Sequence, residues 1–366
     1  MKKFRVLPFC SLTPLALLAL ATFASSAQAQ SQPSSQPSSQ LTLYGNIDTA
    51  VLWSSNTNAQ GQSLTSVGSG GYQLSVWGLM GQEDLGGGLK AFFRLENSFN
   101  ADTGAVSLSS SFFNRFAVLG LRSDDWGAVS LGRLGSIGFD YTVLGYDLTN
   151  LDTYGIAALG AVPFVNLKIN NAVKYETPRL GGVRATLMTS TGQEAAEASS
   201  AGRYTGLAIE YASGAFKTRL THEVTHGSYA TTLDQSGLQD KRSTLAARYD
   251  LGSYAFYGEA AWITGDLHLT PRGRLLQGGV SWRPSPSWTL IGEAGVYDYS
   301  DSDGRPTLSH LVAQYHFSKR TMLYAFGTYV DNHGGSRVST LFAAGAAAPV
   351  AGQSQSTVGL GLAHRF

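Results

Sequence analysis

Residues 41–51, with the sequence LTLYGNIDTAV, alternate between two kinds of side chain. Leu41, Leu43, Ile47 and Val51 fall on one side, and polar or small residues occupy most of the other side. A period of two predicts a β-strand with one apolar and one polar face. The run is also close to the length of about 9–11 residues with which a tilted strand crosses a lipid bilayer.

The same alternation returns along the chain as far as its last residue. Comparable runs occupy residues 90–96, 115–118, 173–176, 183–187, 245–249, 311–317 and 358–366. In the run 115–118 the pattern places Phe116 and Val118 on the apolar face and Arg115 on the polar face. A soluble β-sandwich would alternate too, but charged residues recur here in the middle of the polar faces, where a sandwich normally has small polar residues. The pattern therefore favours an all-β transmembrane protein with a polar lumen.

The connections between these runs alternate in length. Short connections rich in Gly, Pro or Asp lie at 84–88, 123–127, 179–182, 213–214, 251–253, 284–287 and 318–320. Long polar segments lie at 54–71, 134–169, 191–202, 227–241, 265–272 and 332–354. Short turns at one rim and long loops at the other are typical of outer-membrane barrels, and the hairpin count predicts about sixteen antiparallel strands. Closure would pair every backbone N–H and C=O within the lipid.

The first 29 residues are predicted to be a secretory signal peptide. Lys2, Lys3 and Arg5 precede an apolar stretch at 12–23, and Ala27-Gln28-Ala29 has the small-residue pattern of a cleavage site. An uncleaved anchor is disfavoured because the apolar stretch is shorter than the roughly 20 residues that a spanning helix needs.

We expect three parts in the full chain. After the signal peptide, residues 30–40 form a flexible Ser/Pro/Gln segment in which SQPS occurs twice, and residues 41–366 form the barrel. No second long apolar run follows, so spanning helices are not expected.

Composition excludes several classes of function. The one cysteine, Cys10, lies in the predicted signal peptide, so thiol chemistry and disulfides are not expected in the mature chain. Cleavage also removes three of 26 basic residues and leaves all 25 acidic ones, so the formal net charge of the mature chain is 23 − 25 = −2. A negative net charge argues against nucleic acid as a partner.

Motifs for catalysis or metal binding do not emerge from the sequence. No nucleophile elbow or phosphate-binding loop occurs, so an enzyme and a cofactor are not expected. His222 and His226 would lie about 13 Å apart on a strand, so no metal site is predicted.

Several stretches together resemble one family. These are LYGNID at 43–48, GQEDLGGGLKA at 81–91, GAVSLGR at 127–133 and the terminal HRF at 364–366. They resemble the Gram-negative general diffusion porins of the Neisseria and Burkholderia type, over essentially the whole mature chain. The resemblance implies a homotrimer in the outer membrane that passes ions and small hydrophilic solutes by passive diffusion. It also implies lipids and lipopolysaccharide as surroundings, an inward-folded third long loop at 134–169, and recognition of Phe366 by the barrel-assembly machinery.

The expected functional site is a pore constriction with charges of opposite sign on two sides. Its predicted basic wall is Arg94, Arg115, Arg133, Lys174 and Arg184. The acidic residues expected on the inward loop are Asp140, Asp147 and Asp152. Rings of charged side chains and pore diameter set selectivity in channels. The alternative is that these are ordinary solvated charges in a wet lumen.

Three positions qualify this prediction. Val76 and Met80 are expected on the lumen face, where relatives usually carry arginines, so the basic wall is thinner than usual. Arg133 shares the parity of Leu131 and can face the lumen only if the strand ends or bulges beside it.

Two other functions stay open: a barrel enzyme, such as a protease or lipase, and a substrate-specific or adhesin-like barrel.

Overall fold

The computed structural model describes residues 39–107, 111–140, 145–149, 153–156, 158–159, 167–341 and 349–366. The predicted signal peptide lies outside these residues, as does the Ser/Pro/Gln segment up to residue 38. The compact unit that contains the described residues spans Ser38–Phe366.

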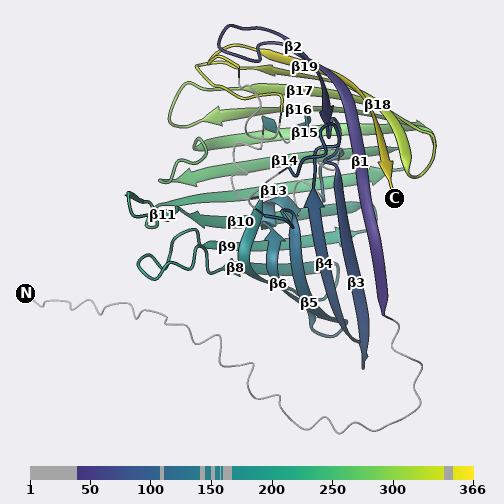
Figure 1. Ribbon diagram of the computed structural model, residues 1–366, viewed down its shortest axis with the longest axis vertical. Helices are drawn as coiled ribbons and strands as arrows, with labels where there is room; N and C mark the ends of the chain where they lie inside the picture. The colour runs from purple at the N-terminus through teal and green to yellow at the C-terminus, as the bar shows by residue number, and fades with distance from the viewer. Residues whose placement is uncertain are drawn as a thin grey trace, which may run out of the picture. The chain divides into compact units, whose positions relative to one another are not determined.

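The described residues form one seventeen-stranded antiparallel sheet and a separate small hairpin (Figure 1). One short strand of the sheet, β2 (Leu64–Ser69), lies on β1, and β11 (Tyr229–Ala230) pairs with β12 (Leu233–Asp234) in the hairpin. The other sixteen strands make up the barrel. They are β1 (Gln40–Ser54), β3 (Val76–Gly86), β4 (Leu89–Ser98), β5 (Phe116–Ser123), β6 (Gly127–Gly135), β7 (Lys168–Glu176), β8 (Val183–Ser190), β9 (Tyr204–Ser213), β10 (Phe216–His226), β13 (Gln239–Leu251), β14 (Tyr254–Gly265), β15 (Gly273–Ser285), β16 (Trp288–Tyr299), β17 (Thr307–His316), β18 (Thr321–Asp331) and β19 (Gln355–Arg365).

The barrel closes where its first and last strands meet. The pairing of β1 with β19 runs from Asn46 opposite Arg365 to Ser54 opposite Thr357. Beyond that register, the backbone N–H of Phe366 donates to the Gly45 carbonyl over 3.1 Å, and Gly45 N–H donates to the Phe366 carbonyl over 3.2 Å. The terminal ring occupies the space beside Gly45, because a Cβ there would lie 2.3 Å from its Cζ atom. The predicted closed antiparallel barrel is thus confirmed.

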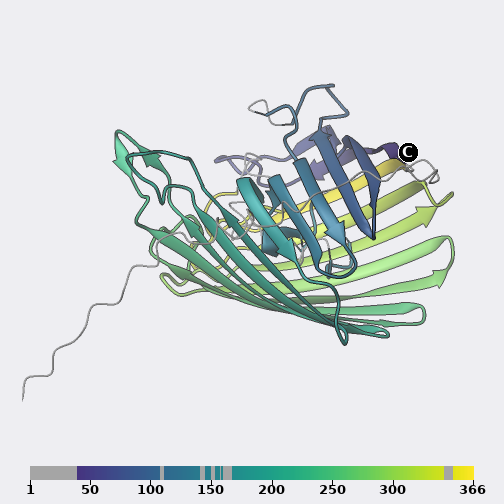
Figure 2. The same cartoon turned by 90° about the horizontal axis from the view of Figure 1, so that it is seen from below.

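The connections alternate in length from one strand pair to the next. The seven short ones join the pairs β3–β4, β5–β6, β7–β8, β9–β10, β13–β14, β15–β16 and β17–β18, in agreement with the predicted hairpins. The long connections include the six predicted segments and two more, at 99–115 and 300–306. Figure 2 shows the strands curving round from β3 to β18.

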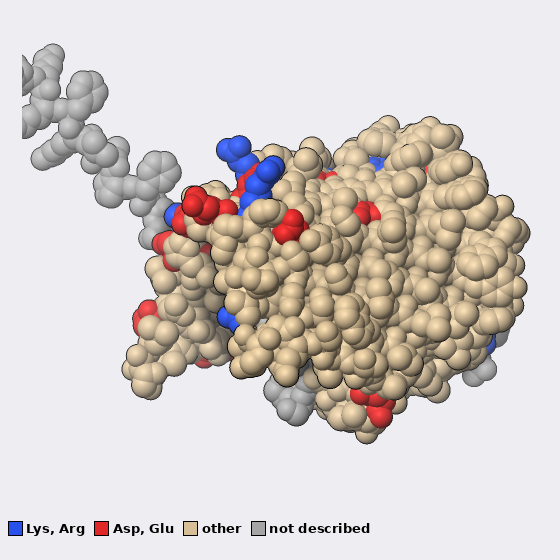
Figure 3. Space-filling view, turned by 90° about the horizontal axis from the view of Figure 1, so that it is seen from above, with Lys and Arg blue, Asp and Glu red and all other residues tan. Residues whose placement is uncertain are grey.

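The outer face of the barrel is apolar. Leu41, Leu119 and Leu311 are 68%, 64% and 68% exposed, whereas Asp48 and His310 on the inner face are fully buried. Such a surface would promote aggregation in water, but it suits contact with lipid chains. Charged side chains occupy only a few places on the face in Figure 3, and a broad region of it carries none.

Aromatic side chains gather on the outer face near the short turns. Tyr254 stacks on Trp282 with ring centroids 6.2 Å apart, and Trp288 contacts Tyr315 at 5.1 Å. Phe317 extends the group, since its ring lies 5.1 Å from that of Tyr315. Aromatic rings of this kind line the membrane interface of outer-membrane barrels. Among the described residues, no helix is long and apolar enough to span a membrane.

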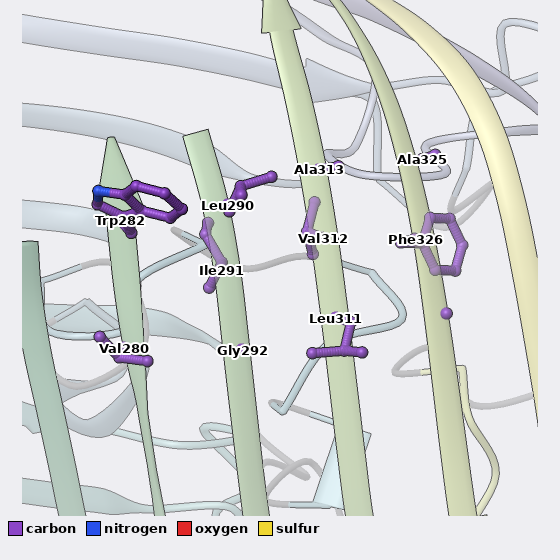
Figure 4. A pocket seen from close by; sticks show the side chains of 11 residues that line it. Val280, Trp282, Leu290, Ile291, Gly292, Leu311, Val312, Ala313, Ala325 and Phe326 are labelled. Carbon is purple, nitrogen blue, oxygen red and sulfur yellow. The ribbon is translucent and has the colours of Figure 1, made fainter. Parts of the chain in front are cut away.

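An apolar groove crosses β15 to β18 between these rings and the middle of the barrel (Figure 4). Val280, Trp282, Leu290 and Leu311 line it together with smaller residues such as Ala313. The groove is part of the apolar surface that faces the lipid.

Candidate functional site: the channel and its two walls

The lumen face of β4 carries a compact charged network. Glu96, which is only 2% exposed, accepts hydrogen bonds from the Arg94 guanidinium over 2.5 Å and from Arg115 Nε over 2.5 Å. Tyr44 Oη donates to the same carboxylate over 2.7 Å and accepts a hydrogen bond from Arg94 Nε over 2.9 Å. Two cations thus share one buried anion, and the network keeps a net charge of 2 − 1 = +1.

Arg115 contacts this network, but the residues that follow it do not lie on the faces that the alternation predicted. It precedes β5, which begins at Phe116, and Phe116 and Val118 are 5% and 8% exposed on the inner face. The exposed apolar residues of the strand are Leu119 and Leu121, so the assignment of Phe116 and Val118 to the apolar outer face was wrong. The physical reason is that Phe116 packs inside against cations: Arg94 Cζ lies 3.9 Å and Lys168 Nζ 3.7 Å from its ring centroid.

Lys174 and Asp140 lie near each other, one on β7 and one on the loop that follows β6. Lys174 Nζ is 3.8 Å from Asp140 Oδ2 and 3.4 Å from Glu176 Oε2, and its side chain is 12% exposed. This contact joins a residue of the predicted basic wall to one of the predicted acidic loop residues.

The other predicted basic residues lie apart from the Glu96 network. Arg133 donates from Nε to the Asn114 carbonyl over 2.9 Å and also bonds the Asn170 side chain. The pairing of β6 with β7 shifts register between Gly132 and Leu134, so a bulge does lie beside Arg133. Arg184, on β8, has a buried Nε atom and stands opposite Glu210 in the strand register.

Asp147 is buried and receives hydrogen bonds from a residue of its own segment. Its carboxylate accepts hydrogen bonds from the backbone N–H and the hydroxyl of Thr149, each over 2.9 Å, and the residue is 2% exposed. Asp152 lies outside the described residues. Among the described residues, the carboxylate that pairs with both arginines is therefore a strand residue, Glu96.

Val76 and Met80 lie on the lumen face of β3. Met80 stands directly opposite Arg94, and Val76 opposite Ser98, and opposed residues of an antiparallel pair point to the same side. Met80 is 40% exposed, so its thioether borders the open lumen beside the Arg94 guanidinium.

Residues of the long segment 134–169 contact widely separated parts of the barrel, on strands and on the connection that precedes β3. Near its start, Ile137 N–H donates to Tyr204 Oη on β9 over 2.8 Å. Further on, Lys217 of β10 bonds the Gly145 carbonyl, and Tyr72 Oη donates to the Thr149 carbonyl over 2.8 Å.

The same segment then reaches β18. The Tyr154 ring stacks on Phe326 with centroids 5.2 Å apart, and Thr328 Oγ1 donates to the Tyr154 carbonyl over 2.7 Å. Ile156 and Leu159 pack with the inner apolar residues of β14, β15, β17 and β18, which include Ala261, Ile263, Leu275, Leu308 and Val330. The apolar inner wall is thus covered by apolar residues of this segment.

Tyr146 is a further anchor of this segment. It is fully buried and donates from Oη to Glu210 Oε2 over 3.4 Å, while Arg219 Cζ lies 5.2 Å from its ring centroid. Burial raises the pKa of the Tyr146 phenol well above its usual value, so the phenol stays protonated and remains a donor.

Sequence reasoning missed these anchors. Tyr72, Tyr204 and Glu210 were not singled out, because each makes its contacts with residues far away in the chain. The one local indication is on β18, where Tyr324 and Phe326 interrupt the expected polar lumen face. Within the described ranges, no three metal-ligating side chains lie close enough together to hold a metal ion.

Comparison with known proteins places this geometry in context. The sequence matches the family model described as Gram-negative porin over residues 16–335. Outer membrane porin protein 32 of Delftia acidovorans is 31% identical, and the match covers 96% of this chain and 99% of that protein. The major outer membrane protein P.IB of Neisseria meningitidis is 31% identical over 187 residues, which are 48% of this chain and 54% of that protein.

Solved structures show the same architecture. An anion-selective porin from Comamonas acidovorans superposes with a TM-score of 0.77 at 28% identity, covering 90% of this chain and all of that one. OmpT, an outer membrane protein of Vibrio cholerae, superposes with a TM-score of 0.67 at 15% identity, and this likeness supports the fold alone.

Proposed function

The chain belongs to the Gram-negative porin family, and from that premise we propose that the segment 134–169 narrows its channel, beside the charged network of Glu96. As an outer-membrane porin, the chain forms a water-filled channel for passive diffusion of ions and small hydrophilic solutes. The proposal concerns how the lumen is shaped and what charge a solute meets.

The contacts of Tyr154 are the observation that carries the proposal. A ring stacked on Phe326 and a carbonyl bonded by Thr328 hold this part of the segment against the inner face of β18. At the other side of the barrel, Ile137 is tied to Tyr204. A segment fixed at both places crosses the lumen and reduces its open width, and pore diameter is a main determinant of selectivity.

The charges proposed to act on solutes lie on the wall of β4 and β5. Arg94 is 42% exposed, whereas Arg115 and Glu96 are 15% and 2% exposed, so Arg94 is the cation of this network that water and solutes reach most easily. With Met80 beside it instead of a further arginine, we expect weak preference for anions rather than a strong one.

Other features of the chain are proposed from its family. These are a homotrimeric assembly, lipopolysaccharide and lipids as surroundings, recognition of Phe366 by the barrel-assembly machinery, cleavage after residue 29 and a flexible segment at 30–40. We propose also that the chain catalyses no reaction. The fixed position of Phe366 beside Gly45 supports a role in closing the barrel, which is compatible with a role in assembly.

Single-channel recording of the purified mature protein in a planar bilayer tests the proposal. We expect stepwise openings that close in groups of three at high voltage, since each subunit of a trimer would carry its own pore. Correctly folded protein that never conducts would contradict the channel, and independent single closures would contradict the trimer.

A second experiment tests the charge assignment. Replacing both arginines (R94Q/R115Q) should move the reversal potential under a KCl gradient toward cations. Because this variant leaves Glu96 buried without a cation, R94Q/E96Q/R115Q is made beside it to separate the charge effect from misfolding. R272Q/R305Q, which removes two cations near the long loops, is the matched control and should leave the potential unchanged. An unchanged potential in both lumen variants would contradict a role of these arginines in selectivity.

A further inference from the structure

A second charged compartment lies at the short-turn end of the channel. A cavity of about 1180 Å³ opens there, between the turns β13–β14, β15–β16 and β17–β18 and the end of β19. Residues of two long connections, Tyr72-Gln73 and Leu148-Thr149, also line it. We refer to this cavity as the short-turn vestibule.

The side chains that line the vestibule are strongly biased toward positive charge. Five of the described lining residues are cationic and one, Asp250, is anionic, which leaves 5 − 1 = +4. The cationic residues are Arg248, Arg283, Lys319, Arg320 and Arg365.

Most of these cations have no carboxylate partner. Arg248 forms an ion pair with Asp250 over 3.0 Å, and Arg365 donates to the neutral Gln73 side chain over 2.7 Å. Arg283, Lys319 and Arg320 are exposed, and among the described residues no carboxylate lies within 4.0 Å of their charged groups. This differs from the Glu96 network, where a buried anion offsets part of the charge.

Neutral donors stand among the cations. Ser253, Ser281, Ser318 and Thr321 line the vestibule, and the Thr289 hydroxyl lies 3.3 Å from His316 Nε2. Guanidinium and hydroxyl groups suit oxyanions, because charge-assisted hydrogen bonds from arginine match the geometry of phosphate and carboxylate oxygens.

Another part of the same rim has an acidic excess. The turns β3–β4 and β5–β6 carry exposed Asp84, Asp124 and Asp125, with Glu83 before the first of them and the cations Lys90 and Arg122 beside them. The two arcs therefore differ in net charge, which favours anions at the cationic arc.

We propose that the short-turn vestibule is a weak binding site for small multivalent oxyanions, the solute class of phosphorylated and polycarboxylated compounds. The inference rests on the proposed function, since it assumes an open channel between the vestibule and the Glu96 network. A solute held at the mouth by several unpaired cations has a raised local concentration and a raised rate of entry. Binding has to stay weak, because conduction requires that the solute leave again.

Inorganic tripolyphosphate is the probe that tests the site. In planar bilayers, tripolyphosphate should reduce the KCl current of the wild-type channel in a concentration-dependent way, and more at low ionic strength. In R283Q/K319Q/R320Q we expect its apparent affinity to fall about tenfold or more. The control R272Q/R305Q/R337Q removes the same charge from residues near the long loops and should be blocked like the wild type.

Calorimetric titration of the detergent-solubilised protein with tripolyphosphate gives a readout that does not depend on conduction. The same loss of affinity in the vestibule variant, with a circular dichroism spectrum like that of the wild type, would support the site. Equal binding or equal block in the vestibule and control variants would overturn it. A channel that conducts KCl but ignores tripolyphosphate refutes the inference alone, whereas absence of any conductance refutes the proposed function.

Discussion

The two walls of the lumen differ in what their inward side chains contact. On β4 and β5 these side chains form an ion-paired network around Glu96, with Arg94 open to the lumen. On β18 they are mostly apolar or aromatic, and Phe326 is covered by Tyr154 of the long segment. Both walls have the same alternating pattern outside, so the difference arises inside the barrel. We propose that one wall presents charge to solutes, while the other wall holds the segment that narrows the channel.

The largest effect is expected from removing the shared carboxylate of the charged wall. E96Q leaves two cations without their anion, and breaking a buried ion pair typically costs about 3–5 kcal/mol. Because Arg94 is 42% exposed, we expect the lower end, about 3 kcal/mol. Urea-induced unfolding in lipid vesicles measures the loss, and E83Q in an exposed turn is the control. A midpoint equal to that of the control would show that the network does not stabilise the barrel.

A smaller effect on stability is expected at the apolar wall. Y154A removes the ring that stacks on Phe326, and truncation of a partly buried aromatic should cost about 2 kcal/mol, less than in a full core. The main consequence should be a higher and noisier single-channel current, because the segment loses one anchor. Y154F keeps the ring and is the matched control. If Y154A conducts like Y154F, the stacking contact does not position the segment.

A substitution beside the charged wall can change its net charge while the ion pairs of Glu96 stay in place. M80R places a third cation opposite Arg94, on the lumen face of β3. We expect a shift of the reversal potential toward anions by a few millivolts under a tenfold KCl gradient, because the new charge is partly exposed and screened by salt. M80Q is the neutral control. A reversal potential equal to that of M80Q would mean that the side chain at position 80 does not face the lumen.

The smallest effect is expected far from both walls. Near the long loops, the hydrogen bond from Arg272 lowers the pKa of Asp301. The pair therefore contributes to stability above the usual pKa of an aspartate, and the contribution is lost as the pH falls through the lowered pKa. R272Q should be slightly less stable than the wild type at pH 7 and equal to it below pH of about 3. Urea-induced unfolding at both pH values measures the effect. A difference in the unfolding midpoint that persists at low pH would show that the loss of stability has another cause.

Sequence alone was sufficient for the barrel because each strand carries its own information. Period-two alternation, short turns rich in glycine and proline, and the terminal Phe366 are all local features. A bulge was also the condition under which Arg133 could face the lumen. The structure has a bulge at this position, with a positive φ of 120° at Gly132.

The inner contacts were harder to predict, because they join residues that are far apart in the chain. Phe116 is apolar and yet faces inward, since cations stack on its ring, and no single strand contains that information. Tyr44 and Glu96 meet across 52 residues, and Tyr154 and Thr328 across 174. The local hydrogen bonds from Thr149 to Asp147 were likewise not predicted.

The most direct test of the two-wall account is single-channel recording of R94Q/R115Q and Y154A beside the wild type, with conductance and reversal potential measured in the same membranes. The account predicts that the first variant shifts the reversal potential toward cations at nearly unchanged conductance. It predicts that the second raises conductance and noise at an unchanged potential. If both variants change both quantities together, or if their effects are exchanged, the division of the lumen into a charged wall and an anchoring wall is contradicted.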